Sequence, residues 1–175
     1  NPEVEATLDR RIPYMSLPEA LREFFLRDKR PIVVAGTHGK TTTTALTAHL
    51  LSTAGFDPSY LIAGLPRGEG HPCHLGAGEY FAIEGDEYDS AFFAKYPKFF
   101  FYMPETLILT GIEFDHADIY ADVAEIEKVF AHLVNIVPGN GLLLAASENR
   151  RVVELARRSF APVQSFGLSP DAYWR

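Results

Sequence analysis

The residues best suited to chemistry form a short turn rich in glycine and threonine. Gly36 and Gly39 lie on either side of a Thr-His pair, and Lys40 and four consecutive threonines follow directly. Such a turn directs several backbone N–H groups toward one point, and a following helix adds its positive N-terminal end. A lysine then reaches the outer phosphates, while a threonine hydroxyl binds Mg²⁺. We therefore predict a phosphate-binding loop with contacts from Gly36, Thr37, His38, Gly39, Lys40, Thr41 and Thr42.

The spacing of this loop departs from the common pattern. The usual phosphate-binding loop has another glycine five residues before the glycine that precedes its lysine, and here that position is Val34. A strand–helix turn with a chance Lys-Thr pair is the alternative explanation. The apolar strand expected before the loop and the helix expected after it favour phosphate binding.

A run of acidic residues follows the apolar segment 80–83. Glu84 comes directly after this segment, and Asp86 follows two residues later. Parallel sheets bind ligands at the carboxyl ends of their strands, so a carboxylate at this place is positioned by the sheet. Carboxylate oxygens are suitable ligands for Mg²⁺. We predict Glu84 as a Mg²⁺ ligand and Asp86 as a second candidate, with a solvated acidic loop as the alternative.

Asp115 and His116 occupy a similar place after the apolar segment 106–109. We expect His116 to bind a second Mg²⁺ or its water shell, with Asp115 orienting the imidazole ring. A local hydrogen bond between the two side chains is the alternative explanation. Because such groups follow two separate strands beside a predicted phosphate loop, a metal site is favoured.

The elements that must position these groups alternate between strands and helices. Short apolar runs predict strands at residues 32–35, 60–63, 80–83, 106–109, 142–145 and 163–166. Helical spacing and capping residues predict helices at residues 16–28, 40–54, 122–134 and 148–159. This alternation predicts an α/β fold with three layers and a mostly parallel sheet that carries the phosphate loop.

Three segments fit neither pattern cleanly. Residues 99–102 are aromatic and ambiguous, and the glycine-rich residues 64–79 are expected to be a loop or a loosely paired hairpin. We expect residues 1–15 to be extended and irregular, as in a linker.

Composition narrows the class of protein. A chain of 175 residues, 47% of them hydrophobic, can bury one full domain core. The net charge of -7 argues against a surface that binds nucleic acid. Cys73 is the only cysteine, which fits a reducing compartment. Neither a signal peptide nor an apolar run near the roughly 20 residues that cross a bilayer is present, so we expect a cytoplasmic protein.

Taken together, the motifs resemble those of the Mur ligase family, in its ATP-binding central domain. The similarity covers the loop at residues 36–42, the acidic strand end at residues 84–87, and the pair Asp115 and His116. It implies ATP and Mg²⁺ as cofactors and small-molecule substrates. It also implies catalytic roles for Lys40, Glu84 and His116, with Mg²⁺ held by Thr41, Glu84 and His116.

The resemblance also implies a reaction. Residues 84–93 and 113–120 are most similar to family members that join UDP-N-acetylmuramate to the tripeptide L-alanyl-γ-D-glutamyl-meso-diaminopimelate, through an acyl phosphate, in peptidoglycan recycling. Members that add L-alanine in peptidoglycan biosynthesis are the alternative. Another phosphate-loop enzyme, such as a phosphotransferase or a folate polyglutamate ligase, and a nucleotide-binding fragment without turnover also remain open.

The domain organisation follows from the same similarity. It implies an interdomain linker at residues 1–15 and an ATP-binding central domain at residues 16–175, incomplete at its C-terminal end. The flanking N-terminal and C-terminal domains of the family would lie outside this sequence. The chain also departs from the family pattern, because Gly111 stands where members usually have Asn.

Overall fold

A computed structural model of the chain describes residues 1–64, 70–91, 94–113, 120 and 122–175. The strands are β1 Arg30–Ala35, β2 Ser59–Leu61, β3 Cys73–His74, β4 Tyr80–Gly85, β5 Asp89–Ala91, β6 Ala94–Pro97, β7 Thr106–Leu109, β8 Leu142–Ala146 and β9 Val163–Phe166. The helices are α1 Pro2–Asp9, α2 Leu17–Leu21, the π-helical turn η1 Arg22–Leu26, α3 Lys40–Thr53, α4 Phe99–Tyr102, α5 Val123–Asn135 and α6 Arg150–Ala156.

One sheet organises the chain. Its strand order is β3-β2-β4-β1-β7-β8-β9, and every neighbouring pair is parallel except β2 with β3. The apolar runs of the sequence form its central strands because a parallel strand covered on both faces gains most from continuous hydrophobicity. The expected α/β fold with a mostly parallel sheet is therefore confirmed.

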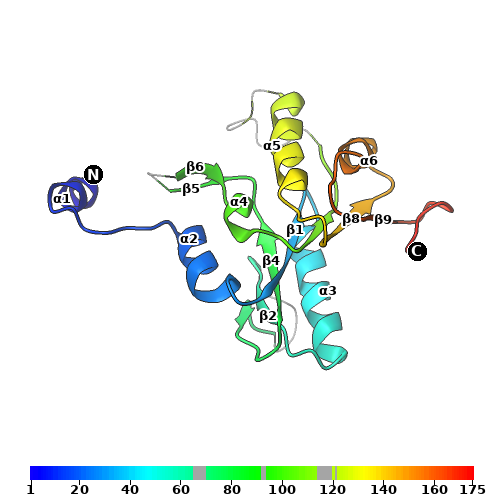
Figure 1. Cartoon of the computed structure of the whole chain (residues 1–175), viewed down its shortest axis with the longest axis horizontal. Helices are drawn as coiled ribbons and strands as arrows, with labels where there is room; N and C mark the ends of the chain where they lie inside the picture. Colours follow the sequence, from blue (N-terminus) through cyan, green and yellow to red (C-terminus); the bar gives the residue numbers. More distant parts are fainter. Residues whose placement is uncertain (65–69, 92–93, 114–119, 121) are drawn as a thin grey trace.

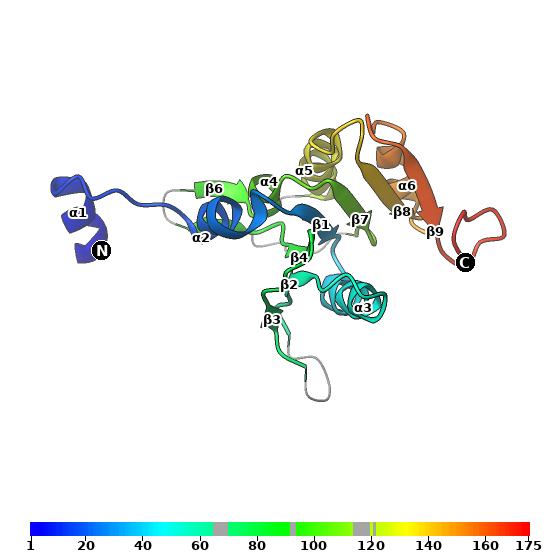
Figure 2. The ribbon, with the colours of Figure 1, turned by 60° about the horizontal axis from the view of Figure 1, so that its bottom comes forward.

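Helices cover both faces of the sheet, which gives three layers. Figure 2 shows α3 on one side, with α4, α5 and α6 on the other. Side chains of β1 alternate between these sides: Val33 belongs to the larger core with Phe99 and Phe130, while Val34 belongs to a smaller cluster with Leu51 of α3. The larger core therefore lies between the sheet and the helices α4, α5 and α6.

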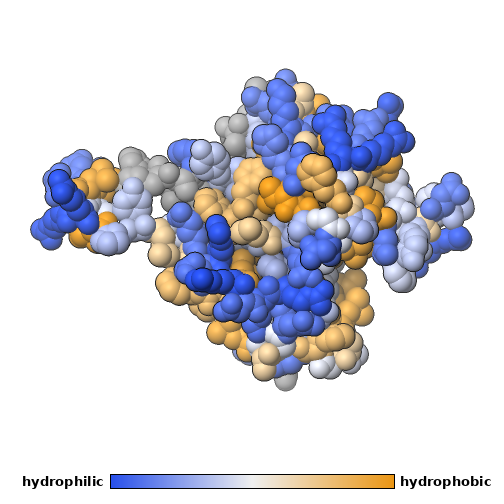
Figure 3. All heavy atoms as spheres, viewed as in Figure 1, coloured by the Kyte–Doolittle hydropathy of each residue, from blue (hydrophilic) through white to orange (hydrophobic). Residues whose placement is uncertain are grey.

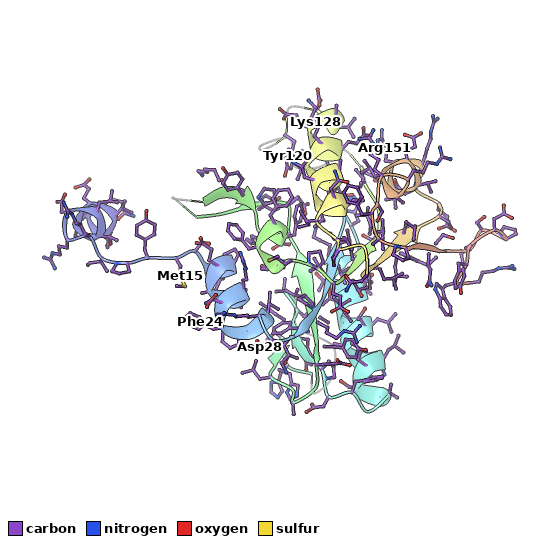
Figure 4. The ribbon with its side chains drawn as sticks, in the orientation of Figure 1. Met15, Phe24, Asp28, Tyr120, Lys128 and Arg151 are labelled. Carbon is purple, nitrogen blue, oxygen red and sulfur yellow. The ribbon has the colours of Figure 1, made fainter. Side chains whose placement is uncertain are left out.

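The outer surface over α5 and α6 is polar. Figure 3 shows hydrophilic residues over these helices, and Arg151 of α6 contacts Glu127 of α5 at 2.9 Å. Figure 4 shows Arg151 and Lys128 directed outward from the two helices. No helix formed by the described residues is long and apolar enough to cross a membrane.

The strand order places three strand ends together. Because β1 lies between β4 and β7, the loops that follow these strands start side by side. Ala35 of β1 pairs with Gly85 of β4 and with Leu109 of β7, so the three ends are level. The carboxyl ends of these strands therefore lead into three neighbouring segments: the glycine loop (residues 36–39), the acidic segment (residues 84–87) and the segment that leads to Asp115.

The expectation that residues 1–15 are extended and irregular was wrong for residues 2–9, which form α1, while residues 12–15 have no regular secondary structure. The Asn1 side chain accepts a hydrogen bond from the Glu3 N–H, Pro2 occupies the first turn, and Glu3 and Glu5 lie near the positive helix end. These are ordinary signals for a helix start. Figure 1 shows α1 set apart from the sheet, joined to α2 by an extended segment.

Other segments differ in detail from the sequence-based expectations. The ambiguous residues 99–102 form α4. The helix expected at residues 16–28 begins with a capping box formed by Ser16 and Glu19 but continues as a π-helical turn. The glycine-rich stretch contributes β3, which pairs with β2. The β5–β6 pair was not predicted.

Candidate functional site

The glycine loop joins the end of β1 to the start of α3. Its two glycines have positive φ angles, 138° at Gly36 and 81° at Gly39, a region that favours glycine. A Cβ atom on Gly36 would also lie 2.8 Å from the Gly111 carbonyl oxygen. Gly36 is therefore required by both its φ and its close neighbours, whereas Gly39 is favoured by its φ alone. Helix α3 begins at Lys40 immediately after the turn.

Residues that follow β7 hold this loop in place. The Thr37 N–H donates to the Gly111 carbonyl at 2.9 Å, and the Thr110 hydroxyl donates to the His38 carbonyl at 2.6 Å. The Thr37 hydroxyl accepts from the Glu113 N–H at 3.2 Å. The backbone of Gly111 thus supports the loop.

These contacts divide the predicted phosphate-binding residues into two groups. Thr37 is buried and its N–H is directed to the β7 exit, so its contacts are those of a supporting residue. The first helical hydrogen bond of α3 joins the Thr43 N–H to the Gly39 carbonyl. The N–H groups of Lys40, Thr41 and Thr42 precede it and are free of helical acceptors, as at any helix start.

Lys40 extends from the first turn of α3 back over the loop. Its ammonium donates to the Gly36 carbonyl at 2.7 Å and contacts Glu87 at 3.1 Å. Glu87 was not among the predicted site residues, although it belongs to the same acidic run as Glu84. Its side chain is only 1% exposed. The acidic run in the sequence did not indicate that this carboxylate is buried.

Thr41 and Glu84 lie together, as predicted for a shared Mg²⁺ ion. The Thr41 hydroxyl donates to Glu84 Oε2 at 2.9 Å, and the Ala63 N–H donates to Glu84 Oε1 at 2.7 Å. Adjacent ligands of an octahedral Mg²⁺ ion, each about 2.1 Å from it, are about 3 Å apart. The separation of the Thr41 and Glu84 oxygens therefore fits two adjacent ligand positions. Glu84 is the fifth residue of β4, not the residue after it, and is buried.

The remaining predicted metal residues are placed differently. Asp86 pairs with Lys98 at 3.1 Å, each side chain being 30% exposed. Asp115 and His116 lie outside the described residues. Among the residues that are described, no group of three His, Cys, Asp or Glu side chains could hold a metal ion. The part of the site that fits Mg²⁺ is thus a hydroxyl with one carboxylate.

Tyr120 supports the acidic segment from the side of α5 (Figure 4). Its hydroxyl donates to the Glu87 carbonyl at 2.7 Å, and its side chain is buried. Burial, together with the nearby charge of Glu87, raises the pKa of Tyr120 to about 12. The hydroxyl is therefore a donor at every physiological pH.

The arrangement places the chain in a class of proteins. A mostly parallel sheet with a glycine turn between a central strand and a helix is the architecture that α/β nucleotide-binding proteins use to bind phosphates. Residues 34–175 match the family model described as the Mur ligase middle domain. The chain belongs to the Mur ligase family.

Curated relatives agree with this assignment. The chain is 51% identical over 144 residues to the UDP-N-acetylmuramate–L-alanyl-γ-D-glutamyl-meso-2,6-diaminoheptandioate ligase of Escherichia coli, a match that covers 82% of the chain and 32% of that protein. It is 39% identical over 173 residues to the UDP-N-acetylmuramate–L-alanine ligase of Bordetella pertussis, covering 98% of the chain and 35% of the relative. The chain thus spans about a third of the length of these relatives.

A solved structure shares the fold closely. The UDP-N-acetylmuramate:L-alanyl-γ-D-glutamyl-meso-diaminopimelate ligase of Neisseria meningitidis superimposes with a TM-score of 0.86 at 39% identity. The match covers 94% of this chain and 54% of that one.

Proposed function

We propose that this chain is the ATP-binding part of a ligase that joins UDP-N-acetylmuramate to the tripeptide L-alanyl-γ-D-glutamyl-meso-diaminopimelate. The observation that carries the proposal is that Lys40, Thr41 and Glu84 lie close together at the carboxyl ends of β1 and β4. Similarity to relatives that carry this activity in their names supports the choice of substrates.

The site residues divide the work of phosphoryl transfer between them. N–H groups at the start of α3 and the Lys40 ammonium would bind and orient the ATP phosphates. Thr41 and Glu84, with His116 as the predicted third ligand, would hold Mg²⁺, which when bound neutralises phosphate charge. Asp115 is proposed to orient His116, and Asp86 stays a secondary ligand candidate.

The proposed reaction has two steps. The γ-phosphate of ATP moves to the muramate carboxylate and gives an acyl phosphate, and the amine of the tripeptide then attacks the acyl carbon and displaces phosphate. Positioning and charge neutralisation supply most of the catalysis in such transfers. The preformed loop and its lysine provide both.

A second candidate is addition of L-alanine to UDP-N-acetylmuramate. The relative from Bordetella pertussis has this activity in its name and matches 98% of the chain. Loop, lysine and carboxylate would have the same roles in either reaction, because the two candidates differ only in the amine that attacks.

We further propose that residues 16–175 are the ATP-binding domain and that residues 1–15 link it to another domain of the full-length protein. The length of the relatives supports this division, since the chain spans only about a third of them. A cytoplasmic location fits the nucleotide substrates. The isolated 175-residue chain is proposed to bind nucleotide without completing the reaction.

Phosphate release by the full-length protein tests the proposal. The protein would receive UDP-N-acetylmuramate and Mg·ATP, with either the tripeptide or L-alanine. Release that requires the tripeptide supports the first candidate, and release with L-alanine alone supports the second. Release with neither would contradict both.

A further inference from the structure

A buried carboxylate contacts the lysine of the glycine loop. The two Glu87 oxygens lie 3.1 and 3.3 Å from Lys40 Nζ. The Glu87 side chain is 1% exposed and that of Lys40 is 14% exposed. A carboxylate withdrawn this far from water is stable only beside a positive charge and hydrogen-bond donors. Lys40 supplies that charge.

The geometry of the ammonium leaves room for a further acceptor. A lysine ammonium has three donors. One is directed to the Gly36 carbonyl at 2.7 Å and another to Glu87. The third has the Thr37 carbonyl at 3.4 Å, a distance at the weak end of hydrogen bonding. A phosphate oxygen can therefore bind Lys40 without displacing Glu87.

From this geometry we propose that Glu87 is a positioning residue that fixes the Lys40 ammonium for the nucleotide phosphates. The proposal rests on the proposed function of the glycine loop. A free lysine side chain loses much rotamer freedom when a ligand immobilises it. The contacts of Lys40 with Glu87 and with the Gly36 carbonyl restrict its rotamers when the protein folds. Nucleotide binding therefore costs less side-chain entropy.

The acidic segment is built to present this particular carboxylate. Its backbone is held by the Tyr120 hydroxyl, which donates to the Glu87 carbonyl at 2.7 Å. Asp86 is engaged by Lys98 at 3.1 Å. The first two residues of α3 thus have partners on one segment: Thr41 contacts Glu84, and Lys40 contacts Glu87.

Nucleotide binding by the full-length protein tests the role of Glu87 without a need for the acceptor substrate. Calorimetry would measure the affinity for a non-hydrolysable ATP analogue with Mg²⁺ in Glu87→Ala, Glu87→Gln, Lys40→Ala and the double variant Lys40→Ala with Glu87→Ala. We expect Glu87→Ala to weaken binding by about tenfold. Glu87→Gln keeps the shape and one acceptor, so its loss should be smaller. The double variant should bind no more weakly than Lys40→Ala alone.

A matched control removes a different ion pair. Glu105→Gln breaks the ion pair of Glu105 with Arg30, which lies where β1 and β7 begin, at the other end of these strands from the glycine loop. This variant should leave nucleotide affinity unchanged. Thermal unfolding of each variant checks that it is folded. If Glu87→Ala does not fold, Glu87→Gln carries the test because it preserves the side-chain volume.

Three results would contradict the proposal in different ways. If Glu87→Ala weakens nucleotide binding as much in the Lys40→Ala background as in the parent protein, Glu87 has a general structural role and does not act through Lys40. Tighter or unchanged binding by Glu87→Gln would show that Glu87 competes with phosphate or is irrelevant to it. An unchanged affinity in Lys40→Ala would contradict the phosphate-loop function itself, and the role of Glu87 with it.

Discussion

The Thr41 hydroxyl donates to the Glu84 carboxylate across 2.9 Å and thereby joins the first turn of α3 to the end of β4. The two residues are 43 positions apart in the chain. They meet because β4 lies beside β1, whose loop leads directly into α3. The oxygens of both residues are hard ligands at a spacing that suits Mg²⁺, and this makes the contact a starting point for tests.

The Thr41 hydroxyl should be required for Mg²⁺ binding. Thr41→Val removes the oxygen at nearly constant volume and is expected to raise the Mg²⁺ concentration for half-maximal phosphate release by about tenfold or more. Thr41→Ser keeps the hydroxyl and should behave like the parent protein. Equal Mg²⁺ dependence in the Val and Ser variants would contradict the predicted ligand role.

The Lys40 ammonium should be essential for turnover. Lys40→Ala in the full-length protein is expected to lower kcat by about 10²-fold or more, because phosphoryl transfer depends on charge stabilisation. Lys95→Ala is the control, since Lys95 is 72% exposed and pairs with Asp89. Turnover of Lys40→Ala close to that of the control would mean that the loop lysine does not act on phosphate.

Gly36 should be far less tolerant of a side chain than Gly55. Both have a positive φ, but a Cβ on Gly55 meets nothing within 4 Å, so Gly55→Ala should cost about 1–2 kcal/mol of stability from backbone strain alone. At Gly36 a Cβ would also collide with the Thr110 hydroxyl and the Gly111 backbone. The free energy of unfolding in denaturant should fall by clearly more for Gly36→Ala, and equal losses would refute the steric explanation.

Tyr120 should make the stability depend on pH in the alkaline range. Burial raises its pKa from 10.0 to about 12, so the folded state holds the phenolic proton more tightly than the unfolded state. The associated stability is complete below pH 10 and is lost as the pH rises toward 12. Tyrosinate absorbance should show this late titration, and Tyr120→Phe should remove the contribution of Tyr120 while leaving that of Tyr102, whose pKa burial also raises.

The same substitution tests the hydrogen bond to Glu87. Tyr120→Phe leaves a buried carbonyl without its donor, which typically costs about 1–3 kcal/mol. A Tyr120→Phe variant with the free energy of unfolding of the parent protein at neutral pH would count against a supporting role for this bond.

Much of the fold followed from local signals. The apolar residues 32–35 became the last four residues of β1 because a strand buried on both faces needs continuous hydrophobicity. Ser16 and Glu19 form a capping box at the start of the helix expected at residues 16–28, and Asp122 caps α5. The helix at residues 2–9 was missed although its start signals were present, because none of its residues is buried and it shows little apolar periodicity.

The candidate site was only partly accessible from the sequence. Glu84 could be selected because it closes an apolar strand, and the sheet then fixes its place beside the loop. Asp86 and Glu87 are adjacent in the sequence, and of the two only Asp86 was predicted as a ligand candidate. The structure pairs Asp86 with Lys98 and Glu87 with Lys40.

By itself, the sequence determined the class of fold, the glycine loop and the strand ends that carry carboxylates, because each depends on residues close together in the chain. Only the tertiary structure decided which carboxylate faces the lysine. That choice depends on Tyr120 and Lys98, which approach the acidic segment from other elements. Burial of Glu87 is a property of this assembly, since a carboxylate loses its water only where several elements close around it.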